Sequence, residues 1–129
     1  MALEALEHYT VNCADLVATR DFYCDILGLR DGYRPALGFA GHWLYCDEVP
    51  VVHLLGQDGV APENAGAEQG GTTGSFDHIA FRGRDAGAMI ARLKTGNIPF
   101  RENLIADINL HQLFVRDPNG ILVEMNFRG

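Results

Sequence analysis

The sequence lacks the features that mark membrane-spanning and secreted proteins. No apolar run approaches the roughly 20 residues that a membrane-spanning helix needs. The three cysteines, Cys13, Cys24 and Cys46, are odd in number and have no C-x-x-C spacing, which favours reduced thiols. The first residues are acidic and lack the basic start of a secretion signal. We therefore expect a cytoplasmic protein.

Basic residues are also scarce. Ten Lys and Arg stand against 17 Asp and Glu, which gives a formal net charge of −7. A protein that binds a nucleic-acid backbone or an anionic membrane needs a basic surface, so both partners are excluded. The chain of 129 residues is 47% hydrophobic, enough to bury a core. The expected partner is a small molecule.

The two halves of the sequence repeat the same order of landmarks. Strand-like segments carry His8 and His78, which are 70 residues apart. Each segment is followed by a predicted helix that opens on an aspartate, Asp15 or Asp85, again 70 residues apart. Aspartate is a favoured N-cap because its carboxylate accepts from the free N–H groups of the first turn. The repeat predicts two copies of one strand–helix–strands unit.

The two predicted helices end at matching glycines. Gly28 and Gly96 follow the last apolar positions and offer left-handed stops. The first helix has a stripe close to helical spacing, and the second has a shorter one. The stripes comprise Leu16, Thr19, Phe22, Tyr23, Ile26 and Leu27, and then Met89, Ile90 and Leu93.

The remaining segments complete each copy with further strands. Copy one has strand-like segments at 38–46, broken near Gly41, and at 51–55. Copy two has them at 99–105, 110–116 and 121–127, with a tight turn at 117–120. The segment 57–75 is poor in large apolar residues, and we predict that it is a linker between the two modules. We predict one domain, made of module 1 at about 5–56 and module 2 at about 76–128.

In four of the predicted strands, alternation puts one chemically active side chain on the face that is not apolar. His8, His53, His78 and Glu124 lie opposite the apolar face that a helix would cover. Each is expected near the middle of its strand. Three imidazoles and a carboxylate in one cavity are costly to bury unless a cation pairs with them. Two histidines and one carboxylate, with open positions, are typical of catalytic Fe²⁺, Zn²⁺, Mn²⁺ or Ni²⁺ sites. His53 is expected as a fourth ligand or as a general base.

Three segments resemble the vicinal oxygen chelate superfamily, which includes glyoxalase I, bleomycin- and fosfomycin-resistance proteins, extradiol dioxygenases and methylmalonyl-CoA epimerase. They are EHYTVNCADLVATRDFYCDILGL, FDHIAFR and LFVRDPNGILVEMNF. The resemblance implies an α+β fold in which two tandem βαβββ modules form an open half-barrel mixed sheet, with helices outside. It also implies a divalent metal held from the first and last strands of each module, at His8, His53, His78 and Glu124.

The resemblance leaves three functions open. The first is a metal-dependent lyase, isomerase or epimerase, acting on a substrate that chelates the metal through adjacent oxygens. His53 replaces the proton-abstracting glutamate that glyoxalase I members carry there, so His53 or Glu124 would transfer the proton. The second is a single-domain Fe²⁺ dioxygenase of the extradiol kind, and the third is a non-catalytic small-molecule or antibiotic-binding protein.

Further residues are candidates for substrate contact, and the fold suggests a partner. The substrate candidates are Trp43 on a middle strand, Arg82 after the strand-like segment of His78, and His111 at the expected mouth of the half-barrel. An open sheet edge invites pairing with a second chain, so we also expect a homodimer.

Overall fold

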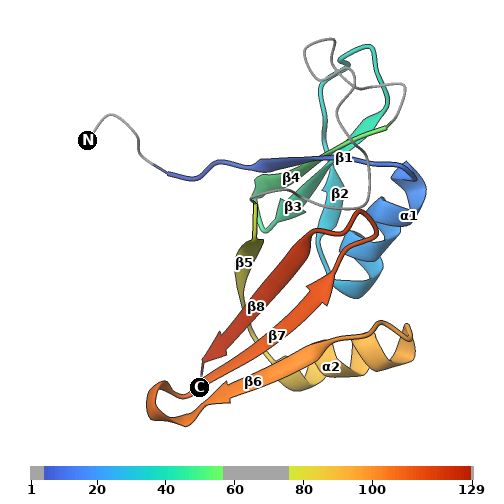
Figure 1. Ribbon diagram of the computed structural model, residues 1–129. Helices are drawn as coiled ribbons and strands as arrows, with labels where there is room; N and C mark the ends of the chain where they lie inside the picture. Colours follow the sequence, from blue (N-terminus) through green and yellow to red (C-terminus); the bar gives the residue numbers. More distant parts are fainter. Residues whose placement is uncertain (1–4, 57–75, 129) are drawn as a thin grey trace. The chain divides into compact units, whose positions relative to one another are not determined.

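The computed structural model describes residues 5–56 and 76–128 (Figure 1). The chain divides into two compact units, residues 1–70 and 71–129, whose positions relative to one another are not determined. Each unit is therefore described by itself. The predicted linker, 57–75, lies outside the described residues. Within the described ranges, no helix has the length and apolar character needed to cross a membrane.

Unit 1 is a four-stranded mixed sheet with one helical segment. Its elements are β1 (Tyr9–Asn12), α1 (Leu16–Asp21), a π-helical turn (Phe22–Ile26), β2 (Arg30–Gly32), β3 (Gly41–Cys46) and β4 (Val49–Leu55). The strand order is β1-β4-β3-β2, with β1 parallel to β4 and the other pairs antiparallel.

Unit 2 repeats this topology. Its elements are β5 (His78–Gly83), α2 (Ala86–Thr95), β6 (Arg101–Ile105), a 3₁₀ turn (Ala106–Ile108), β7 (Leu110–Arg116) and β8 (Leu122–Arg128). The order β5-β8-β7-β6 has one parallel pair followed by two antiparallel pairs. The predicted α+β class and the βαβββ module are therefore confirmed.

The helix caps follow the predicted repeat, with one difference. The Asp15 and Asp85 carboxylates each accept from the backbone N–H three residues later, at 3.0 Å in both units. Gly28 has a φ of +88° and ends the first helical segment as expected. Gly96 follows α2 but has a φ of −82°, and Asn97, with a φ of +55°, takes the left-handed conformation. Asparagine tolerates that region better than most residues, so the left-handed stop lies one residue later than predicted.

The first helix is not regular throughout. After Asp21 the backbone widens, and the Leu27 N–H donates to the carbonyl of Phe22, five residues back, at 3.1 Å. Tyr23 in this π-helical turn is fully buried, and its hydroxyl lies 3.2 Å from that of Tyr9. The apolar stripe predicted this helix, but it did not predict the change of helical type.

The face of each sheet that was predicted to be apolar forms the core. Unit 1 buries Val52 and Leu54 of β4 completely, and α1 packs against β3 and β4. Unit 2 buries Val123 completely and leaves Met125 only 4% exposed, while Leu93 is the buried side chain of α2. The three cysteines, all within the described ranges, form no disulfide.

Gly41 marks a close approach of backbone to backbone. The predicted break in the 38–46 segment lies here, because β3 begins at this residue. A Cβ atom at this position would overlap the carbonyl oxygen of Leu54 and lie 3.0 Å from the guanidinium of Arg34. Only glycine fits both neighbours.

Candidate functional site

The four predicted side chains form two equivalent pairs, one in each unit. In unit 1, Tyr9 of β1 is in register with Val52 of β4; His8 directly precedes the first, and His53 directly follows the second. In unit 2, Ile79 of β5 is in register with Val123 of β8, and His78 and Glu124 hold the same two places beside them. The two pairs therefore occupy the same places in the repeated fold. His53 and Glu124 lie well inside their strands, whereas His8 precedes β1 and His78 opens β5, so neither histidine is mid-strand as predicted.

In unit 2, His78 and Glu124 face each other. The Nε2 atom of His78 lies 3.3 Å from Oε1 of Glu124, and its Nδ1 atom lies 2.7 Å from the Asp77 carboxylate. These carboxylates favour the charged imidazole, so the hydrogen bond to Asp77, with a smaller contribution from Glu124, raises the pKa of His78. When His78 is neutral with its proton on Nδ1, a lone pair on Nε2 faces the carboxylate. That arrangement needs a proton or another cation between the two atoms.

A chain of side-chain amides holds the other oxygen of Glu124. Its Oε2 atom accepts from Asn126 at 2.8 Å and from Gln112 at 3.4 Å. Gln112 also donates to Asn126 at 3.0 Å and accepts from Asn103 at 2.9 Å. These groups come from β6, β7 and β8, and they lie on one face of the sheet, which we call the Glu124 face. The network fixes the carboxylate while Oε1 stays directed at His78.

A hollow of about 500 Å³ lies along the Glu124 face, with Phe114, the register partner of Glu124, in its lining. The guanidinium of Arg101 lies 4.2 Å from the centre of the Phe114 ring. Arg116 also lines the hollow and donates to the carbonyl of Gly120 at 3.0 Å. The candidate Arg82 lies on the same face, because it is in register with Asn126, and it is exposed.

In unit 1, three flat rings stack on one another, from the residue before β1, from β4 and from β3. The His8 and His53 ring centres are 3.7 Å apart with planes 10° from parallel. The Trp43 ring lies on the other side of His53, at 4.2 Å and 11°. Trp43 is also the register partner of His53. We call this side of the sheet the His53 face, and the substrate candidate Trp43 lies on it.

The two histidines of this stack differ in which nitrogen is available. The Nδ1 atom of His8 lies 2.9 Å from the Glu7 carboxylate, which leaves Nε2 for another partner. The Nε2 atom of His53 lies 3.1 Å from the carbonyl of Pro50. A carbonyl only accepts, so this nitrogen carries the proton and Nδ1 holds the lone pair. Burial, and then the nearby charge of His8, lowers the pKa of His53, so its neutral form is favoured.

The geometry of the pairs indicates which residues fit a metal ion. Two atoms that each lie about 2.1 Å from one ion are separated by roughly 3.0–3.4 Å at ordinary ligand angles, and the His78–Glu124 separation of 3.3 Å falls in that range. In contrast, an ion in the plane of the His8 ring lies outside the nearly parallel plane of His53. While stacked, these two rings cannot both bind one ion. Within the described parts of the chain, no group of three or more His, Cys, Asp or Glu side chains is close enough to hold a metal.

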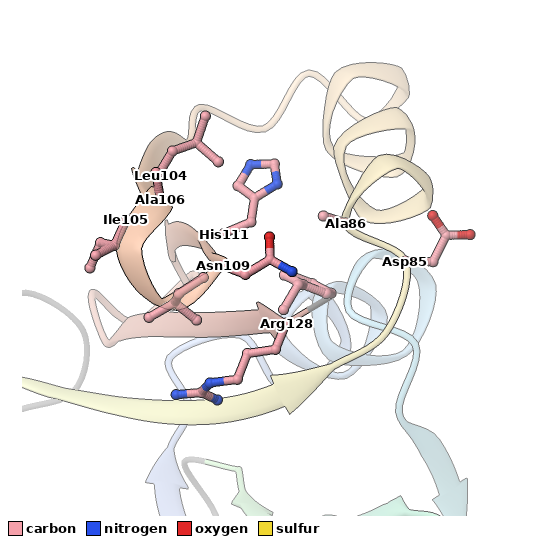
Figure 2. Close-up of a pocket in the computed structure, with 10 residues that line it drawn as sticks. Asp85, Ala86, Leu104, Ile105, Ala106, Asn109, His111 and Arg128 are labelled. Carbon is pink, nitrogen blue, oxygen red and sulfur yellow. The ribbon is translucent and has the colours of Figure 1, made fainter.

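His111, the third substrate candidate, lies on the other side of the sheet from the Glu124 face. It is in register with Phe127 and Leu104, and strand alternation therefore puts it on the opposite side of the sheet from Glu124. Its Nε2 atom lies 2.8 Å from the Glu102 carboxylate. The ring lines a separate hollow, whose volume is about 510 Å³. Figure 2 shows it near the start of α2 at Ala86. The sequence already indicated this side, because strand alternation puts His111 on the same face as the apolar Leu113 and Val115.

Sequence reasoning missed the carboxylates that orient the two equivalent histidines. Glu7 and Asp77 each directly precede a histidine, and each bonds the Nδ1 atom of that histidine. Metal-ligating histidines commonly donate their second ring N–H to a carboxylate in this way. The signal was an acid–histidine dipeptide that recurs after 70 residues.

Comparisons with known proteins agree on one fold. The model of the Glyoxalase/Bleomycin resistance protein/Dioxygenase superfamily matches residues 5–125. A glyoxalase/dioxygenase from Nostoc punctiforme is similar at a TM-score of 0.75 and 19% identity, over 97% of this chain and 91% of that one. Lactoylglutathione lyase from Agrobacterium tumefaciens is similar at a TM-score of 0.67 and 21% identity, over 98% of this chain and 96% of that one. TnmS3, an antibiotic binding protein from Streptomyces sp. CB03234, is similar at a TM-score of 0.69 and 19% identity, over 100% of this chain and 99% of that one. No curated protein matches the chain.

Proposed function

The chain belongs to the Glyoxalase/Bleomycin resistance protein/Dioxygenase superfamily, and we propose that it is a divalent-metal-dependent enzyme of the glyoxalase-like lyase, isomerase or epimerase kind. Its substrate is a small molecule that presents two adjacent oxygens. His8, His78 and Glu124 are the proposed ligands of an Fe²⁺, Zn²⁺, Ni²⁺ or Mn²⁺ ion, and His53 is the proposed base. This choice removes His53 from the four ligands that the resemblance implied.

The observation that carries the proposal is the arrangement of His78 between two carboxylates. Asp77 holds Nδ1, and Nε2 faces Oε1 of Glu124 at 3.3 Å. His8 repeats half of this arrangement, because Glu7 holds its Nδ1 and leaves Nε2 available. Two histidines with one carboxylate match the open metal sites of catalytic proteins. The joint use of both units is part of the proposal and rests on the equivalent positions of the two pairs.

His53 has the properties of a proton acceptor. Its pKa is lowered, so the neutral ring is favoured. The bond from Nε2 to the Pro50 carbonyl directs the basic lone pair to Nδ1. Trp43 and His8 cover the two faces of the ring, which restricts its rotation and excludes water from those faces. General bases work best when their pKa lies near the working pH, and an imidazole meets that condition.

The proposed reaction divides the work between the metal and the side chains. When bound, the metal would act as a Lewis acid that stabilises negative charge on the substrate oxygens, a contribution of several kcal/mol. His53 Nδ1 would accept the proton beside a substrate carbonyl and return it at a second position. The amide network of Asn126 and Gln112 would hold the Glu124 carboxylate in a fixed orientation during the transfer.

Two other functions have specific support. A two-histidine, one-carboxylate set with open positions also suits Fe²⁺-dependent ring cleavage of catechols, so an extradiol-type dioxygenase is the second candidate. The stack of aromatic rings at His8, His53 and Trp43 suits a non-catalytic protein that binds aromatic molecules by further stacking. TnmS3, a protein of similar fold, is described as an antibiotic binding protein.

Metal analysis of protein purified without oxygen tests the proposal. We expect a bound divalent metal in the native chain, and its loss in His78→Ala and Glu124→Ala. His111→Ala is the matched control, because His111 lies on the opposite face of the sheet from Glu124 and should leave metal content unchanged. Oxygen uptake with catechols would identify the dioxygenase instead of the lyase or isomerase.

Full metal retention in both ligand variants would contradict the proposed site. Saturable binding of aromatic ligands by a metal-free chain, unaffected by His78→Ala, would favour the binding protein.

A further inference from the structure

Arg34 lies between β2 and β3 of unit 1 and is held in place on two sides. Its Cζ atom lies 5.0 Å from the centre of the Phe39 ring. Its Nη2 atom packs over Gly41, where even a Cβ atom would come within 3.0 Å. The guanidinium is therefore fixed by an aromatic ring and by bare backbone, and no carboxylate is among these contacts.

One edge of this guanidinium is buried and lacks acceptors. Nε and Nη2 are both buried, and neither has a hydrogen-bond partner in the described chain. Buried charged donors are nearly always paired in folded proteins. Nε–H and one Nη2–H point in the same direction, and this edge of arginine binds two oxygens of a carboxylate or phosphonate side by side. The unpaired edge matches a ligand with two oxygens.

The guanidinium belongs to the same side of the sheet as the stacked rings. Gly41 and Trp43 are two residues apart in β3, so they share a face. The positive charge of Arg34 also acts on His53, where it contributes to lowering the pKa. Arg34, Phe39 and Trp43 thus bring a fixed positive edge and two aromatic rings to the His53 face.

We infer that Arg34 is an anion-binding residue, which holds the carboxylate or phosphonate group of a small substrate on the His53 face. The inference deepens the proposed function and rests on it, because it names the substrate class of the same site: a small organic acid. Binding of the acidic group does not require the metal. Metal-free protein can therefore test it separately.

Trp43 is the only tryptophan in the chain and provides the readout. We would titrate EDTA-treated protein with benzoate, phenylphosphonate and benzamide at constant ionic strength, and follow the Trp43 fluorescence. At least one anion should bind saturably, and at least about tenfold more tightly than neutral benzamide, as expected for loss of a charged hydrogen-bond pair. The stronger of the two anions identifies the oxyanion that the substrate carries.

Three variants separate the role of Arg34 from general charge effects. Arg34→Met should weaken anion binding at least about tenfold and remove the preference over benzamide. Arg34→Lys should retain part of the anion affinity, since lysine keeps the charge but loses the paired donors. Arg30→Met is the matched control and should bind as the native chain does, because the Arg30 guanidinium is already engaged with Tyr45 and the Asp47 carbonyl.

Thermal unfolding checks that each variant is folded, and Arg34→Gln replaces Arg34→Met if the latter is not. Equal affinity for benzoate, phenylphosphonate and benzamide would overturn the inference. So would the absence of saturable anion binding, or an unchanged affinity in Arg34→Met. Loss of the metal site with intact Arg34-dependent binding would contradict the proposed enzyme and leave the anion site standing.

Discussion

At the residue scale, the chemistry of each candidate ligand depends on its immediate neighbour in the sequence. Glu7 and Asp77 bond the Nδ1 atoms of His8 and His78 and thereby select the nitrogen that remains available. His53 has no such neighbour and uses the Pro50 carbonyl, which selects the opposite nitrogen. His8 and His78 therefore present Nε2, whereas His53 presents Nδ1. A histidine's identity alone does not define its role.

The pairing of Asp77 with His78 gives a direct prediction. In Asp77→Asn, the pKa of His78 should fall towards the ordinary histidine value, because the largest cause of its raised pKa is removed. The charged pair stabilises the native chain below the pKa of an unfolded histidine, and this contribution is lost as pH rises through the raised folded-state value. An NMR titration of the His78 ring protons in metal-free protein measures the change.

Glu102→Gln is the matched control for this prediction. It removes a carboxylate that contacts His111 on the opposite side of the sheet, so the His78 titration should stay as in the native chain. A His78 pKa that is unchanged in Asp77→Asn would show that the 2.7 Å contact does not control the ring.

At the scale of the elements, the sequence was informative wherever a pattern repeats along one strand or helix. The aspartate caps and the apolar faces follow from spacing and were predicted correctly. The strand β2 has three residues, too few for an alternation to be visible, and it was missed. The π-helical turn was missed because the apolar stripe of an α-helix passes through it without interruption.

Contacts between strands were less predictable, because register is set by pairing in three dimensions. Asn103, Gln112 and Asn126 form a network with Glu124 only once β6, β7 and β8 align. Nothing in their separate segments indicates that alignment. His111 is the opposite case: its phase relative to Leu113 and Val115 already placed it on the buried side.

Gly41 gives a prediction about the start of β3. Gly41→Ala should lower the free energy of unfolding by about 1–3 kcal/mol, since the new methyl group would overlap the Leu54 carbonyl oxygen and press on Arg34. Chemical denaturation measures this change. Gly87→Ala in α2 is the control: its Cβ would meet only the Asp85 carboxylate, at 3.6 Å. That variant should be stabilised by roughly 0.4–1 kcal/mol. Equal stability of the two variants would contradict the close approach at Gly41.

At the scale of the whole molecule, we expect two chains to associate. β6 is the last strand of its sheet and is exposed along its length, and Leu104 within it is 70% exposed. An edge strand with free backbone groups and apolar side chains favours pairing with another chain. Light scattering should give twice the 14.1 kDa mass of one chain. Leu104→Lys should shift the mass towards a single chain, and a monomer in both proteins would contradict the prediction.

Each four-stranded sheet is built from one continuous stretch of chain, β1 to β4 in the first unit and β5 to β8 in the second. Recombination between residues 56 and 76 would therefore exchange one complete sheet. All strand pairs of the other sheet would stay intact, because both partners of each pair lie in the half of the chain that is kept. Because each sheet carries one of the two equivalent side-chain pairs, such an exchange would replace His53 or Glu124 together with its whole supporting framework. In evolutionary terms, the two halves can diverge as separate units of inheritance, and a new combination of ligand and base can arise in a single step.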